Sequence, residues 1–214
     1  MKKKILFLLC ILIVFTFTAC GKEVERGENA DMKEKLIEST SQKKIESDDS
    51  KVEKEKNENV RVVYFSATGT TKEVAGTLAE VLETDAVEII PQETYSFGDL
   101  DYNNDNCRAN KEMNDDNSRP DIKNDLNVVK ECDMVYIGYP IWWGTAPRII
   151  QTFFETYDLS GKTVYLFCTS GGSGIEQSVQ DLQEKYKDVN IVSGKRFSEG
   201  VSEEEIREWM NEKE

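Results

Sequence analysis

Residues 60–71 have the sequence VRVVYFSATGTT, in which an apolar run passes directly into a turn rich in hydroxyl groups. The apolar residues do not alternate with polar ones, which predicts a strand of a parallel sheet covered by helices on both faces. Val74, Leu78, Val81 and Leu82 follow at the spacing of an amphipathic helix. Unpaired N–H groups and the helix dipole meet where the turn enters this helix, so the stretch predicts an anion site.

Strands and helices alternate along the rest of this part of the chain. We predict further strands at 86–90, 134–139, 163–168 and 189–192, and helices at 121–130, from Pro147, after Gly174 and from Ser202. This alternation predicts an open parallel sheet wound on both faces, with ligands beyond the carboxyl ends of its strands. Ser202 and Glu205 have capping-box spacing. Residues 91–120 are polar and too long for an ordinary connection, which predicts a functional excursion.

The composition excludes several classes of site. The chain has no histidine, so imidazole catalysis, Ser-His-Asp or Cys-His pairs and histidine-ligated metals are excluded. No two of the five cysteines have C-x-x-C spacing, although Cys107 and Cys132 could form a disulfide. Cys168 is expected to be a buried core residue.

Charge is strongly unbalanced in residues 60–214, which hold fifteen basic and twenty-nine acidic residues. Such a surface repels nucleic acid and anionic lipid and would steer a basic protein partner. The alternative is that the charge only keeps the protein soluble. Arg108, Arg119 and Arg148 could touch a phosphate or a partner, or lie as solvated surface residues.

The N-terminal region has the pattern of an export signal. Lys2 to Lys4 precede an apolar stretch, and Phe17-Thr18-Ala19-Cys20 resembles a bacterial lipoprotein signal in which Cys20 is acylated after cleavage. The alternative is an ordinary secretory signal. We therefore expect a signal peptide at 1–19, the lipidated Cys20 and a disordered charged tether at 20–59, and a folded domain at 60–214. The expected location is the cell membrane, lipid-anchored on the extracytoplasmic side.

The first loop at the predicted ligand edge offers hydroxyl groups where nucleotide loops have glycines. Ser66, Thr68, Thr70 and Thr71 suit a terminal phosphate monoester, whose three exposed oxygens accept several hydrogen bonds. Helix capping is the alternative, because Thr70 and Glu73 have capping-box spacing.

Two further loops follow strands at the same edge. In PIWWGTAP, residues 140–147, two adjacent indoles cannot both enter one core, so one is free to offer a flat face to a planar ring. The alternative is that both cover the sheet edge. In SGGSG, residues 170–174, the glycines allow a ligand close to the backbone, or simply form a turn.

Together these loops resemble the flavodoxin family, over residues 60 to about 214. The matching segments are YFSATGTT (64–71), RPDI (119–122), GYPIWWG (138–144) and FCTSGGSG (167–174). The resemblance implies a flavodoxin-like, three-layer, doubly wound sheet of five parallel strands in the order 2-1-3-4-5. It also implies FMN as the cofactor, bound where the strand order reverses, for which flavodoxin is a type example.

By this resemblance the first loop holds the FMN phosphate and the other two border the flavin ring. The implied cofactor-binding residues are Ser66, Ala67, Thr68, Gly69, Thr70, Thr71, Pro140, Ile141, Trp142, Trp143, Gly144, Thr169, Ser170, Gly171, Gly172 and Gly174. Flavodoxins usually place a tyrosine in the third loop to stack on the flavin, and this loop has none. Tyr95, Phe97 or Tyr102 of the excursion would have to replace it.

Three functions are compatible with these features. The first is an FMN-dependent electron carrier for redox partner proteins with a basic docking surface, held at the membrane by its lipid anchor. The second is an FMN-dependent NAD(P)H quinone or nitro reductase, with the excursion building the second substrate site. The third is a flavodoxin-fold lipoprotein without flavin. No catalytic residue, metal or nucleic-acid partner is expected.

Overall fold

The computed structural model describes residue 57 and residues 59–212 of the chain. The predicted signal peptide, Cys20 and nearly all of the predicted tether lie outside the described residues. In the described part, no helix is both long and apolar enough to cross a bilayer.

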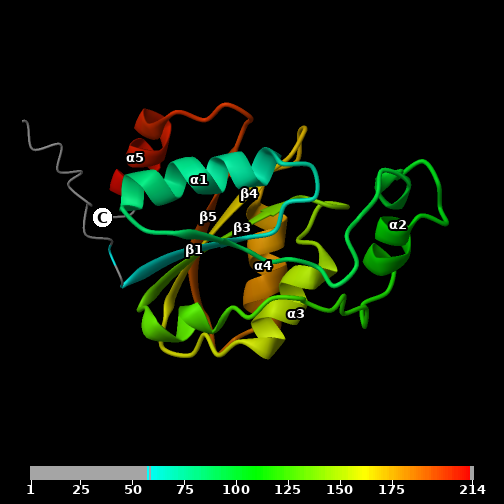
Figure 1. The fold of residues 1–214 in the computed structure, drawn as a ribbon, viewed down its shortest axis with the longest axis horizontal. Helices are drawn as coiled ribbons and strands as arrows, with labels where there is room; N and C mark the ends of the chain where they lie inside the picture. The colour runs from blue at the N-terminus through cyan, green and yellow to red at the C-terminus, as the bar shows by residue number, and fades with distance from the viewer. Residues whose placement is uncertain (1–56, 58, 213–214) are drawn as a thin grey trace, which may run out of the picture. The chain divides into compact units, whose positions relative to one another are not determined.

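The centre of the domain is a parallel sheet of five strands in the order β2-β1-β3-β4-β5 (Figure 1). This order is the one that the resemblance implied. The strands are β1 Val60–Tyr64, β2 Ala86–Glu88, β3 Met134–Pro140, β4 Thr163–Thr169 and β5 Asn190–Phe197. The chain passes from β1 to β2 on one side and then returns to place β3 on the other side, so the strand order reverses at β1 and β3.

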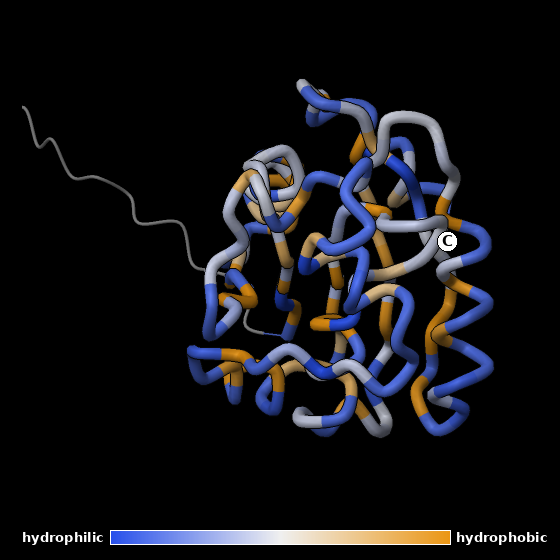
Figure 2. The backbone as a smooth tube through the Cα atoms, turned by 90° about the vertical axis from the view of Figure 1, so that its right-hand side faces the viewer, coloured by the Kyte–Doolittle hydropathy of each residue, from blue (hydrophilic) through white to orange (hydrophobic). Residues whose placement is uncertain are grey.

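Helices cover both faces of this sheet. The helices are α1 Thr70–Leu82 and α5 Glu203–Asn211 on one face, and α3 Arg148–Thr156 and α4 Glu176–Lys185 on the other (Figure 1). In Figure 2, hydrophobic and hydrophilic segments alternate along the helical turns, as expected for helices with one buried side. The Ser202 Oγ accepts a hydrogen bond from the Glu205 N–H at 3.2 Å, which confirms the predicted start of α5.

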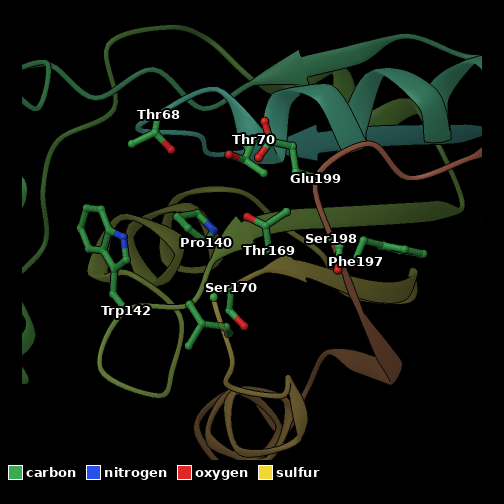
Figure 3. A pocket seen from close by; sticks show the side chains of 11 residues that line it. Thr68, Thr70, Pro140, Trp142, Thr169, Ser170, Phe197, Ser198 and Glu199 are labelled. Carbon is green, nitrogen blue, oxygen red and sulfur yellow. The ribbon is translucent and has the colours of Figure 1, made fainter.

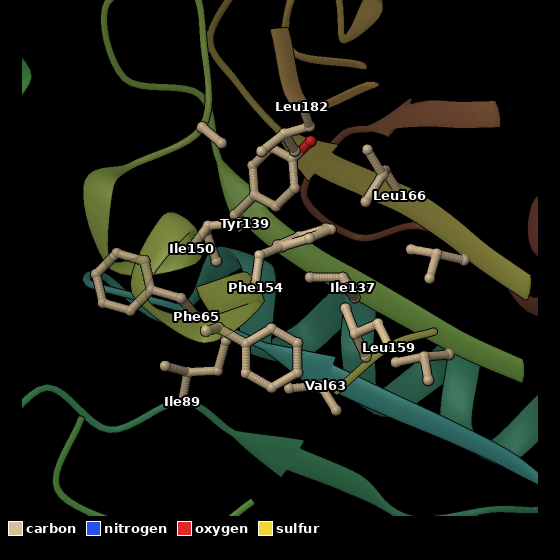
Figure 4. Packing of buried hydrophobic residues seen from close by; sticks show 14 of the residues in the cluster. Val63, Phe65, Ile89, Ile137, Tyr139, Ile150, Phe154, Leu159, Leu166 and Leu182 are labelled. Carbon is tan, nitrogen blue, oxygen red and sulfur yellow. The ribbon is translucent and has the colours of Figure 1, made fainter. Parts of the chain in front are cut away.

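Alternate side chains of each central strand enter two separate cores. Val62 and Tyr64 pack with α1 and α5, whereas Val63 and the following Phe65 pack in the larger core with α3 and α4. Figure 4 shows this larger core, in which Tyr139 and Ile150 are completely buried. The apolar runs that predicted strands with both faces covered are therefore explained by burial on each face.

The helix predicted at 121–130 is wrong. Residues 121–126 are irregular, Ile122 forms an antiparallel bridge with Pro91, and only Asn127–Glu131 forms a 3₁₀ helix (η2). The side chain of Asn124 accepts from the Ile90 N–H at 2.9 Å and donates to the Glu88 carbonyl at 2.8 Å. The backbone itself pairs with the residues after β2, because the Lys123 N–H donates to the Ile90 carbonyl and the Asp121 carbonyl accepts from the Gln92 N–H, both at 2.8 Å. These groups are therefore not available for a helix.

Strand β5 is longer than the predicted 189–192. Its register with β4 shifts between Val164 and Tyr165, which pair with Ile191 and Ser193 and leave Val192 as a bulged residue. The strand then continues to Phe197. Side chains of Ile175 and Val179 lie 2.9 Å from where a Cβ of Gly194 would stand, so α4 packs directly on the strand backbone there.

The excursion contains a 3₁₀ helix, Gly98–Leu100 (η1), and a short helix, α2 Arg108–Met113. Three arginines fix this segment. Arg108 bonds Glu112 at 2.6 Å, Arg148 bonds the Met113 carbonyl at 2.9 Å and Asp116 at 2.6 Å, and Arg119 bonds Glu155 at 2.7 Å. The three arginines are therefore paired within the domain rather than free in solvent, and contact of any of them with a phosphate or a partner stays a prediction.

Cys107 and Cys132 are both free, so the suggested disulfide does not form. The Cys107 Sγ accepts from the Asn110 N–H at the start of α2, whereas Cys132 lies in the larger core and donates to the Val129 carbonyl. Each thiol therefore makes a hydrogen bond to a backbone group three residues away in the sequence.

Candidate functional site

A cavity of about 380 Å³ opens at the carboxyl edge of the sheet, where the loops after β1, β3 and β4 converge (Figure 3). Eight of the predicted site residues line it: Thr68, Thr70, Pro140, Ile141, Trp142, Thr169, Ser170 and Gly171. Thus the three loops chosen from the sequence meet at one cavity.

The first loop leads into α1 through Gly69, which has a φ of +103°. In the described chain no side chain caps this helix, and Thr70 is its first residue, so the capping-box alternative for Thr70 and Glu73 is wrong. Instead the Gly69 N–H donates to the Ser66 Oγ at 3.1 Å, which closes the turn. The first N–H groups of a helix have no acceptor within it, and this helix begins at a cavity that Thr68 and Thr70 line.

Thr71 has a different place from the one predicted. Its side chain is buried, and its Oγ1 shares a 2.7 Å hydrogen bond with the Thr169 Oγ1. This bond ties the first turn of α1 to the end of β4. Thr71 therefore joins two walls of the cavity from behind.

The two tryptophans of the second loop diverge, as predicted. Trp142 and Thr145 exchange two backbone hydrogen bonds of 3.0 Å, and Trp143 and Gly144 between them have φ angles of +48° and +84°. Positive φ at both central positions is typical of a type I′ turn. Trp142 lines the cavity, whereas Trp143 is 46% exposed and, like Gly144, lies outside its lining.

Trp142 is held by aromatic contacts with two other elements. Its ring centroid is 5.6 Å from that of Phe65 and 5.1 Å from that of Tyr95, both edge to face. The Tyr95 hydroxyl donates to Glu112 at 2.6 Å, which orients its ring. The excursion therefore supports Trp142 from behind through Tyr95.

None of the three aromatic residues proposed to replace the missing tyrosine lines this cavity in the described chain. Tyr95 is buried behind Trp142, and Phe97 is 94% exposed. Tyr102 lines a separate hollow next to Trp142 and Trp143.

The third loop contributes Ser170 and Gly171, while Gly172 and Gly174 lie outside the lining. The Ser170 Oγ donates to the Ser173 carbonyl, and the Ser170 carbonyl accepts from Arg196 at 3.4 Å. These contacts fix the conformation of the loop that lines the cavity together with Trp142.

The sequence prediction missed the end of β5, where Phe197, Ser198 and Glu199 complete the lining. Glu199 and Thr70 both lie on the α1 side of the cavity in Figure 3. The only signal for this loop was the strand itself, which was predicted to end five residues too early.

Cys168 is fully buried beside Thr169, as expected of a core residue. Burial raises the pKa of its thiol to about 12. The thiol is therefore neutral and inert at physiological pH.

Comparison with known proteins gives one matching family and several solved structures. A sequence model described as flavodoxin matches residues 59–213. Among curated proteins, none matches the chain. Crystal structures of proteins assigned as flavoproteins match from Bacteroides eggerthii DSM 20697, at 44% identity, and Bacteroides uniformis ATCC 8492, at 42%. Both have a TM-score of 0.69 and cover 72% of this chain, and 96% and 97% of their own.

A more distant match is a flavoprotein from Lactobacillus acidophilus NCFM, solved in complex with FMN. It is 20% identical with a TM-score of 0.48, and the match covers 71% of this chain and 98% of that one.

Proposed function

The chain belongs to the flavodoxin family, and on that basis we propose that it binds FMN and transfers electrons through it. The observation that carries the proposal is the cavity at the carboxyl edge, beside the point where the strand order reverses at β1 and β3. Such switch points are where open α/β sheets bind ligands. This cavity has hydrogen-bond donors at one end and an aromatic wall at the other.

The donor end suits the phosphate of FMN. Ser66, Thr68, Thr70 and the backbone from Ala67 to Thr71 would hold it, with the uncapped start of α1 supplying N–H groups and the positive end of the helix dipole. No lysine or arginine lines this cavity in the described residues. Binding therefore depends on neutral donors and the helix end.

The other loops would border the flavin ring. Pro140, Ile141 and Trp142 form one side, and Thr169, Ser170 and Gly171 form the other. When bound, FMN supplies the redox chemistry, and the chain positions it and excludes water. Among the lining residues of the described chain only Glu199 is an acid or a base.

FMN binding is tested by titrating FMN into flavin-free protein and following flavin fluorescence, with riboflavin, which lacks the phosphate, as the comparison. Thr70→Val should weaken FMN about tenfold and leave riboflavin almost unchanged, because one hydrogen bond to a charged group is lost. Thr77→Val is the matched control, since that exposed hydroxyl bonds only the Glu73 carbonyl within α1. If the purified chain takes up no FMN, it is a flavodoxin fold without flavin.

Electron transfer is proposed toward partner proteins with a basic docking surface, because residues 60–214 hold fifteen basic and twenty-nine acidic residues. Chemically reduced protein should reduce cytochrome c, used as a basic probe, at a rate that falls as ionic strength rises. A rate that does not change with salt would argue against electrostatic docking. Sustained NADH or NADPH oxidation by the protein would favour the reductase instead.

We also propose that the domain is anchored on the extracytoplasmic side of the cell membrane through lipidated Cys20, as the Phe17-Thr18-Ala19-Cys20 pattern suggests. Cys20→Ala should move the protein from the membrane fraction to the soluble fraction. An unchanged distribution would sink this part of the proposal.

A further inference from the structure

A second hollow of about 270 Å³ lies beside the first cavity, lined by Tyr102, Ile141, Trp142 and Trp143. We propose that it binds a neutral, planar two-ring compound of the naphthoquinone type. This deepens the proposed function, because it names a class of small molecule that would lie next to the bound cofactor.

The lining decides the chemistry of the ligand. Three of its residues are aromatic and one is aliphatic, so it offers flat apolar surface and one phenolic hydroxyl. A nicotinamide dinucleotide would need donors for its pyrophosphate, and in the described chain this lining contains no lysine or arginine. The acidic surface would also repel the negatively charged dinucleotide, whereas it would not repel a neutral ring.

Trp143 is held in an unfavourable backbone conformation to form this wall. Its φ of +48° lies in the left-handed region, which disfavours any residue with a Cβ. The backbone bonds between Trp142 and Thr145 fix the turn, and the Thr145 Oγ1 donates to Asp181 at 2.6 Å. An exposed indole on a strained, well-anchored turn indicates a role at the surface rather than in packing.

Tyr102 is 72% exposed, yet its backbone is fixed from beneath. The buried Asn110 donates through its side chain to the Tyr102 carbonyl at 3.2 Å and to the Asn104 carbonyl at 2.7 Å. Arg148 in turn anchors the end of the same short helix. The excursion therefore brings Tyr102 to the same hollow as Trp143, with its backbone held by hydrogen bonds.

The two hollows share a wall, since Ile141 and Trp142 line both. A ring in the second hollow would lie against residues that border the cofactor cavity. This continuity distinguishes the site from an exposed apolar residue such as Phe97, which lines neither hollow in the described chain.

The test is calorimetric titration of 2-methyl-1,4-naphthoquinone into the full chain saturated with oxidised FMN. Tyr102→Ala and Trp143→Gly should each weaken its binding about tenfold, because each removes one aromatic face. Phe97→Ala is the matched control and should leave the affinity unchanged. Absence of binding, or binding that neither Tyr102→Ala nor Trp143→Gly weakens, would overturn the proposal.

The two proposals fail separately. FMN uptake is measured first by flavin fluorescence, and if the chain takes up none, the same quinone titration is made on the flavin-free protein. Quinone binding that depends on Tyr102 without FMN uptake would remove the proposed function and leave this site. FMN uptake without such quinone binding would leave the proposed function and remove this site. Circular dichroism checks that each variant is folded, and Tyr102→Ala, on the surface, is the variant least able to disturb folding.

Discussion

The substitution Gly138→Ala tests how closely β3 and β4 are packed, because it adds a methyl group between them. Gly138 pairs with Phe167 across the two strands, and a Cβ there would lie 2.0, 2.2 and 2.7 Å from three atoms of the Phe167 ring. Carbon atoms in contact need about 3.5–4 Å, so the ring or the strand must move by roughly 1.5 Å. Phe167 is completely buried, in the core that packs with α1 and α5.

Overpacking of a filled core costs about 1–3 kcal/mol in general. Because three ring atoms overlap at once, we expect Gly138→Ala to lower the free energy of unfolding by about 3 kcal/mol, a large part of the stability of a typical domain. The loss should be recovered in part when the ring is made smaller, so Gly138→Ala with Phe167→Leu should cost less than the sum of the two single changes.

Urea unfolding followed by circular dichroism measures these free energies. Gly76→Ala is the matched control: it lies inside α1 with nothing within 4 Å of the added carbon, and alanine should stabilise the helix by about 0.5–1 kcal/mol. A loss below about 1 kcal/mol for Gly138→Ala, or strictly additive changes in the double variant, would refute the expected clash.

Four further outcomes are expected. Glu199→Gln should strengthen FMN binding about two- to fivefold at low salt, since it removes a carboxylate from the α1 side of the cavity, and added salt should erase the difference. Arg148→Met should speed hydrogen exchange in residues 112–116 while leaving β3 and β4 protected, because the Met113 carbonyl and Asp116 lose their donor. Cys168 should resist iodoacetamide in the native protein up to pH 9; its neutral thiol also means that stability falls as pH rises from the ordinary thiol value of 9.0 toward about 12, and Cys168→Ala should lessen that fall. Redox titration should give bound FMN a lower potential than free FMN, because the acidic surface disfavours the extra negative charge of the reduced cofactor.

The central strands could be predicted because burial on both faces leaves an unambiguous apolar run. The segment at 121–130 shows the limit of that reasoning. Ile122, Leu126 and Val129 recur at helical spacing because all three enter or pack against the larger core. Periodicity reports burial, whereas the backbone there is held by bonds to residues 88–92, from its own peptide groups and from the side chain of Asn124, which no pattern reveals.

The site was predictable in part for a similar reason. The loops after β1, β3 and β4 were found because the ends of those strands were predicted correctly, whereas the edge strand β5 was predicted to end too early, so the loop after it was missed together with Glu199. The hydroxyl pattern of the first loop could not show that Thr71 turns inward to Thr169, because that contact joins residues 98 positions apart. The capping box failed because Gly69, through its positive φ, starts α1 without a side chain.

The bulge at Val192 has a consequence for how molecules of this protein meet one another. An open sheet has two edges, and a long, regular edge strand can pair with a strand of another molecule and seed aggregation. Here one edge, β2, has only three residues, and the other is interrupted at Val192 and then carries Lys195 and Arg196. Neither edge offers a regular template for a strand of another molecule, which disfavours polymerisation through the sheet. The irregularity of β5 is at Val192, whose side chain is exposed.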